Sequence, residues 1–254
     1  MFKRANLYDD TLNSYDILKL VALAAMVLDH MGAYFWPQLE WLRAVGRLAF
    51  PFFLFLVGYS GVWKISCELV VCALLIILCA IVTHHSVFPL NILVTIIITR
   101  LAMDWLIRKE MLPQRFAFVS FACVVWFPLM LWFDYSTLAI VFALAGYLQR
   151  QHTHSTQKSI FIYAVVLLYF VIECVIFRFH FASLCILAFE AIIMAYLMIH
   201  FYVHTRSESA SVPATHILQW IARNTLPLYT IHVVLFMILE RVWFPERLDQ
   251  FRWL

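Results

Sequence analysis

The chain has 254 residues, of which 65% are hydrophobic and only 13% are charged, and its net charge is +3. Soluble domains average about 25% charged residues and need a polar shell, so this composition excludes a soluble protein. The small net charge comes without a basic arm, which also excludes a nucleic-acid-binding protein. We therefore predict an integral membrane protein.

The spanning segments follow in chain order. Residues 1–14 are polar, and the apolar run after them lacks a small-residue cleavage site, which favours a retained first span over a signal peptide. A spanning helix needs roughly 20 mainly apolar residues. About nine spans are predicted on that basis: Tyr15–Trp36, Arg43–Trp63, Ile65–His84, Leu90–Ile107, Phe116–Phe133, Tyr135–Leu148, Ser159–Phe177, Phe181–Tyr202 and Thr225–Trp243. Pro227 predicts a kink near the start of the last span.

The fold class is then all-α and polytopic, with one transmembrane domain over residues 1–254 and a short external tail at 244–254. Orientation follows from the basic residues of the loops. Ten cations gather on the side of the N-terminus: Lys3, Arg4, Lys64, Arg108, Lys109, Arg115, Arg150, Lys158, Arg206 and Arg223. The first four opposite connections hold only Arg43 and Arg178, so the N-terminus is predicted to be cytoplasmic, in a bacterial inner membrane.

The first span contains an adjacent acid and base, Asp29 and His30, within "MVLDHMGAYFW". Ionisable residues in spans are costly and usually face a bundle interior or an aqueous cavity, so a functional site is favoured over a structural hydrogen-bonded pair. Lys19 lies 11 residues before His30, which is about 16 Å along a helix and close to three full turns. Lys19 and His30 are therefore predicted to share one face and to open into a central cavity across the bilayer.

The second span, "GRLAFPFFLFLVGYSG", adds Arg47 and Pro51. Arg47 is predicted to pair with Asp29 and to fix the two helices; the alternative is that it extends to the outer interface. Pro51 is predicted to bend the helix and to free one backbone carbonyl.

Other polar groups lie in later spans. Arg100 and Asp104 are four residues apart, which predicts an ion pair on one helix face. Asn91 is predicted at the outer mouth of the cavity, and Glu68, Glu173 and Glu190 as helix-linking or protonated residues. The six cysteines form no C-x-x-C pair, and no metal site is predicted.

The sequence resembles the TraX family, named for a conjugative-pilin N-acetyltransferase. The resemblance is strongest over "SYDILKLVALAAMVLDHMGAYFW…GRLAFPFFLFLVGYS" and continues in "PLNIL", "DYSTLAIVFALAGYL" and "LPLYTIHVVLF". It is more distantly similar to the wider transmembrane acyltransferases, including the acyltransferase-three and heparan-glucosaminide N-acetyltransferase groups. Their first helix carries a basic residue and then a histidine after ten intervening residues, which correspond to Lys19 and His30; arginine is usual at the first position.

The resemblance implies an acetyl-CoA-dependent acyltransferase that moves an acetyl group from the cytosol to an acceptor at the outer side. Cations on the inner side would then bind the donor: Lys19, Lys64, Arg100, Arg108 and Arg115. His30 would act as general base, because histidine titrates near neutral pH. Asp29 would orient its ring, while Tyr229 and His232, three residues apart on one helix face, would line the cavity. An acetyl-histidine intermediate and direct transfer both remain open.

The acceptor implied by the resemblance is a protein N-terminus, a glycan or a lipid headgroup. The sequence leaves open whether the protein forms a homodimer. One alternative is a proton-coupled permease that uses Asp29, His30, Arg100 and Glu190 as a relay. The lack of two corresponding halves in the sequence disfavours it. A non-catalytic assembly partner is the third reading.

Overall fold

A computed structural model describes residues 12–109, 137–151, 156–177, 179–203 and 213–244. The regular elements of these residues are helices: α1 (Ser14–Tyr34), α2 (Glu40–Gly46), α3 (Ala49–Ser60), α4 (Cys67–Val82), α5 (Ile92–Arg108), α7 (Leu138–Arg150), α8 (Thr156–Phe177), α9 (Phe181–Ile199), α10 (Pro213–Arg223) and α11 (Thr225–Trp243). The predicted all-α fold is confirmed over this part of the chain.

Within the described part of the chain, five segments are long and apolar enough to cross a bilayer: α1, α2 with α3 (Glu40–Ser60), α8, α9 and α11. The apolar helices α4 and α7 are shorter. The described residues therefore support a multi-pass protein, whereas the count of nine spans stays a prediction. The predicted span Phe116–Phe133 lies outside the described residues.

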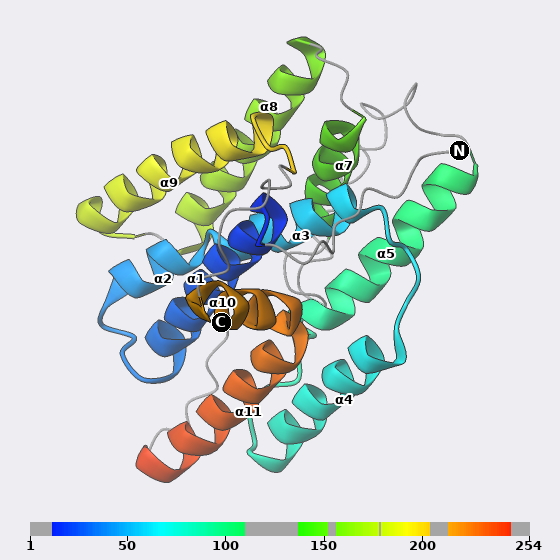
Figure 1. Cartoon of the computed structure of the whole chain (residues 1–254). Helices are drawn as coiled ribbons and strands as arrows, with labels where there is room; N and C mark the ends of the chain where they lie inside the picture. The colour runs from blue at the N-terminus through cyan, green and yellow to red at the C-terminus, as the bar shows by residue number, and fades with distance from the viewer. Residues whose placement is uncertain (1–11, 110–136, 152–155, 178, 204–212, 245–254) are drawn as a thin grey trace.

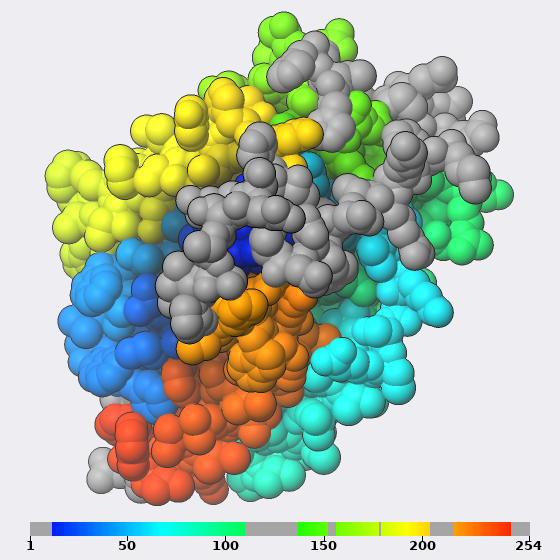
Figure 2. All heavy atoms as spheres, in the orientation of Figure 1, coloured from blue at the N-terminus to red at the C-terminus, as the bar shows by residue number. Residues whose placement is uncertain are grey.

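The helices close into a ring around α3 (Figure 1). Neighbours in contact run from α1 to α11, α4, α5, α7, α8, α9 and α2, and α2 returns to α1. Figure 2 shows these neighbours on the surface: α9 lies beside α2, above it in this view, and α4 lies beside α11. Because α3 contacts α1, α5 and α7, it fills the ring on the side where α1 begins.

The packing of α3 against α7 depends on two glycines. A Cβ on Gly58 would collide with the backbone of Ala143, and a Cβ on Gly146 would collide with the backbone of Phe55. Such close approach of two helix backbones is typical of small residues in membrane bundles. Arg150, at the end of α7, donates to the carbonyl of Ser60 and so covers the C-terminal end of α3.

The break between α2 and α3 falls at Arg47 and Leu48, four residues before the bend predicted at Pro51. Pro51 still explains it, because a proline at position 51 removes the N–H that would bond the carbonyl of Arg47. That carbonyl accepts instead from the Tyr169 hydroxyl of α8, at 2.8 Å. The freed carbonyl was predicted, and here it joins two helices.

Two further observations concern the C-terminal third of the chain. α10 is an additional helix that none of the predicted spans contains. Pro227 lies in the first turn of α11, three residues after the break between α10 and α11 at Asn224, as Pro51 lies after the break before α3.

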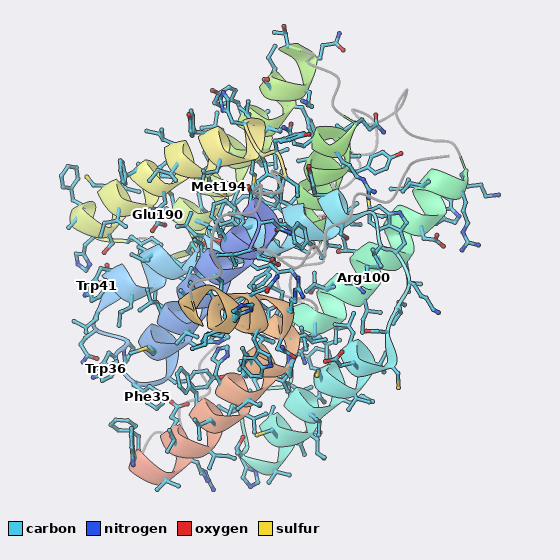
Figure 3. All side chains as sticks on the ribbon, viewed as in Figure 1. Phe35, Trp36, Trp41, Arg100, Glu190 and Met194 are labelled. Atoms are coloured by element: carbon cyan, nitrogen blue, oxygen red, sulfur yellow. The ribbon has the colours of Figure 1, made fainter. Side chains whose placement is uncertain are left out.

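Aromatic side chains mark the two ends of the bundle. Trp36, Trp41 and Trp243 are exposed near the end of α1, and the first two lie at one edge of the molecule in Figure 3. Trp105 and Trp220 are exposed on α5 and α10, towards the start of α1. Tryptophans of this kind lie at membrane interfaces. The ends of α1 are therefore assigned to the two bilayer surfaces.

Candidate active site

A cavity of about 330 Å³ opens at the end of the bundle where α1 terminates. Its walls come from the last turns of α1, α4, α8 and α11, the start of α5, and α2. Met26, Phe50 and Leu138 lie among its apolar lining residues. Volumes of this size are typical of small-molecule sites.

His30 lines this cavity and bonds to a second histidine. Its Nδ1 lies 2.8 Å from Nε2 of His232, and Nδ1 of His232 lies 3.2 Å from the carbonyl oxygen of Leu228. A carbonyl only accepts, so the His232 Nδ1 carries a proton and its Nε2 accepts when the ring is neutral. His30 Nδ1 must then donate, which leaves the lone pair of a neutral His30 on Nε2. The chain of hydrogen bonds thus selects the tautomer of His30 in which Nε2 is the nitrogen that can accept a proton.

Aromatic rings hold the two imidazoles in place. Tyr34 meets His30 edge-on at 6.1 Å between ring centroids, and Tyr229 lies at 5.9 Å. His232 stacks on His30 at 5.0 Å and meets Phe236 edge-on at 5.5 Å. These contacts limit rotation of both rings, so the orientation of His30 does not depend on one hydrogen bond alone.

Asp29 faces α2 and not the ring of His30. Its carboxylate lies 3.1 Å from Arg43 and 3.6 Å from Arg47, so the predicted pair with Arg47 is confirmed. Arg47 also lies 3.4 Å from Glu173 of α8, which confirms Glu173 as a helix-linking residue. The ring of Phe177 lies over the Arg47 guanidinium at 3.9 Å. Asp29 was predicted to orient the His30 ring, but in the described contacts His232 bonds the Nδ1 of that ring, while Asp29 is turned about 100° away from it.

A further group of polar side chains, His85 with Glu240 and Thr83, lies at the mouth of the cavity. Nε2 of His85 is 3.0 Å from Glu240 of α11, and its Nδ1 is 2.7 Å from the Thr83 hydroxyl. Both ring nitrogens of His85 are therefore occupied, so it is no rival to His30 as a base. Asn91 also lines the cavity as predicted, while its side chain caps α5 and donates to the carbonyl of Ala73.

Four of the predicted donor-binding cations lie within the described residues and do not line this cavity: Lys19, Lys64, Arg100 and Arg108. Lys19 lies over the ring of Tyr15, at the start of α1. It is seven residues before Met26, where the cavity ends, which is about 10 Å along the helix. The expected space shared by Lys19 and His30 is thus wrong for this structure.

The other described cations of that set lie in the half of the bundle where α1 begins. Arg100 donates to the carbonyl of Lys64, and Asp104 pairs with Arg108 at 2.8 Å. The predicted pair of Arg100 with Asp104 is therefore wrong, because a helical acid pairs better with a base four residues after it than before it. Lys64 is exposed, and Arg115 lies outside the described residues.

The sequence did not single out His85 with Glu240, nor Arg43 as a partner of Asp29. His85 and Glu240 are 155 residues apart, and no local pattern links them. Arg43 lies one turn before Arg47 on one helix, so the same spacing rule would have placed both near Asp29. Among the described residues, no cluster of three or more His, Cys, Asp or Glu side chains suits a metal ion.

Comparison with known proteins gives the relationship of the chain. It is 24% identical over 230 residues to the uncharacterized protein RP591 of Rickettsia prowazekii (strain Madrid E), covering 88% of this chain and 90% of that protein. No solved structure matches. The TraX protein family model matches residues 14–240, which include His30, its partner His232 and the paired carboxylates of the described cavity wall. The chain therefore belongs to the TraX family.

Proposed function

We propose that the protein is a membrane-bound acyltransferase that moves an acetyl group from cytosolic acetyl-CoA to an amine or hydroxyl at the outer side of a bacterial inner membrane. The observation that carries this proposal is the hydrogen-bonded chain from the Leu228 carbonyl through His232 to His30. It leaves Nε2 of His30 as the base in a cavity that opens at the outer end of α1. Membership of a family linked to pilin acetylation supports the same reaction class.

His30 takes the proton from the acceptor as its nitrogen or oxygen attacks the thioester carbonyl. The C–S bond of the tetrahedral intermediate then breaks, and CoA leaves as the thiol with the proton that His30 held. The Arg43 and Arg47 guanidinium groups lie in the same cavity wall and stabilise negative charge that develops on the carbonyl oxygen. Asp29 and Glu173 balance these two cations, so the wall remains close to neutral before the substrate enters. Asp29 is thus a positioning residue that acts through the arginines.

The donor enters from the cytosolic side in this proposal, with Lys19, Lys64, Arg100, Arg108 and Arg115 as the cations available to its phosphates. The acyl arm must then pass the segment of α1 between Lys19 and Met26. This segment is packed in the structure, so donor entry requires α10 or the inner end of α11 to move away from α1.

The test uses purified protein in lipid nanodiscs with radiolabelled acetyl-CoA. We expect slow release of acetate from the wild type and loss of at least about a hundredfold in His30→Ala, with donor binding retained. His200→Ala is the matched control, because His200 is exposed at the end of α9 and bonds the carbonyl of Tyr196 in its own helix. Absence of acetyl-CoA binding would favour the permease, and binding without turnover at any acceptor would favour the assembly partner.

A further inference from the structure

Arg241 of α11 is the lining charge that the proposed mechanism does not use. The other Asp, Glu and Arg side chains in the described cavity wall are paired, Asp29 and Glu173 with the arginines of α2 and Glu240 with His85. For Arg241, no hydrogen bond or ion pair joins it to another residue that the structure describes. The described wall thus holds three carboxylates and three guanidinium groups, and the guanidinium without a partner of its own is that of Arg241.

Glu240 does not pair with Arg241 among the described contacts, although it is the preceding residue. Adjacent positions on a helix face different directions, and only those three or four apart lie side by side. The Glu240 carboxylate is held by His85, which Thr83 holds in turn. The guanidinium of Arg241 therefore remains available to a ligand that enters from the outer surface.

The position of Arg241 on α11 sets the distance between the bound anion and the two histidines. Arg241 lies nine residues after His232 on α11, which corresponds to about 13 Å along the helix. Tyr229, Val233 and Met237 lie on the same cavity-lining face of this helix. A ligand anchored at Arg241 and lying along this face would reach the level of the two histidines with its other end.

We propose that Arg241 binds a carboxylate or phosphate group of the acyl acceptor, about 13 Å from the atom that receives the acetyl group. The inference rests on the proposed function, since it assigns the acceptor of that same site. Guanidinium groups bind both anions through paired hydrogen bonds. The same chemistry would also attract the phosphate of a lipid headgroup, because arginines near helix ends extend to the interface. Arg241 is half-buried and lines the cavity wall, which favours the acceptor.

A peptide series tests the assignment. Extended residues rise about 3.3 Å each, so the tetrapeptide Gly-Ser-Gly-Ser places its carboxylate about 13 Å from its amine. Binding of this peptide and of its C-terminal amide is measured by thermophoresis in an uncharged maltoside detergent. We expect the wild type to prefer the carboxylate about tenfold, Arg241→Lys to keep part of the preference and Arg241→Gln to lose it.

Lys109→Gln, which removes an exposed charge beyond the far end of α5, is the control and should keep the full preference. The dipeptide Gly-Ser is too short to reach both ends and should show less than about a twofold difference. Equal binding of carboxylate and amide by the wild type, a preference that survives in Arg241→Gln, or binding of neither peptide would each overturn the assignment.

The same measurement in phosphatidylcholine nanodiscs separates the two sources of anion. A preference that persists there supports the acceptor. A preference present in detergent and lost in nanodiscs would assign Arg241 to lipid phosphate and overturn the proposal. If the peptide preference holds but no peptide is acetylated from acetyl-CoA, the acyltransferase function fails while the anion site stands.

Discussion

The hydrogen bond between His30 and His232 gives a prediction in which the acceptor of that bond is first removed and then restored. His232→Ala removes the acceptor at 2.8 Å from His30 Nδ1 and leaves the His30 ring free to adopt either neutral tautomer. Loss of one hydrogen bond of about 1.4 kcal/mol corresponds to a tenfold lower rate. We expect about that reduction in acetyl-CoA turnover, with donor binding unchanged.

His232→Gln should restore the rate to within about threefold of the wild type. The Gln side-chain N–H donates to the Leu228 carbonyl in place of His232 Nδ1, which turns its amide oxygen towards His30. Thr230→Val on the same helix is the control, because the Thr230 hydroxyl donates only within its own helix, to Leu226, among the contacts described. If His232→Ala turns over like the wild type, or if Gln fails to restore the rate in a protein with an unchanged Tm, the tautomer argument is refuted.

Three further predictions concern stability. Asp29→Asn removes the carboxylate that Arg43 and Arg47 share and leaves Glu173 as the one carboxylate for two buried cations in the described wall, which should cost about 3–5 kcal/mol and lower the Tm in detergent by roughly 10 °C. Asp104→Asn, in a largely exposed pair, should change the Tm by less than about 2 °C, and equal shifts would contradict the first prediction. Tyr169→Phe leaves the carbonyl freed by the proline without its donor and should lower the Tm by several degrees, and an unchanged Tm would mean that another group satisfies that carbonyl. Gly58→Ala should abolish the monodisperse peak in size-exclusion chromatography, because its Cβ meets the backbone of α7; a normal peak would show that the two helices separate easily.

The helices could be predicted well from the sequence, since apolar runs of bilayer length leave few alternatives. α1 and α11 begin and end within two residues of their predicted bounds. The break at Arg47 was placed four residues late, because the effect of a proline falls on the carbonyl of the preceding turn and not on the proline itself. α10 was missed because it is amphipathic and short, and a search for spanning segments does not detect such helices.

The candidate site was predicted less completely. The cost of burying ionisable groups pointed to Asp29, His30 and Arg47, and the structure brings these three to one cavity wall. Their pairing depended on contacts between distant segments. His232 is 202 residues from His30, so its hydrogen bond, and with it the tautomer of His30, could not be read from local spacing.

The cations predicted to bind the donor could be identified in the sequence, but their role could not be predicted from it. Any multi-pass protein collects lysine and arginine on its cytoplasmic side, so their presence carried little information about a donor site. In the structure, Arg108 is engaged with a helical neighbour and Arg100 with a backbone carbonyl. Helix periodicity placed Lys19 and His30 on one face, but packing of the bundle closes the space between them.

Transport of the acetyl group across the bilayer is the most direct test of the proposed function. Proteoliposomes are prepared with radiolabelled acetyl-CoA only on the side of the N-terminus and an impermeant amine acceptor only on the other. The account predicts labelled acceptor with the wild type and none above background with His30→Ala. Labelling that requires donor and acceptor on the same side, or that persists in His30→Ala, would contradict it.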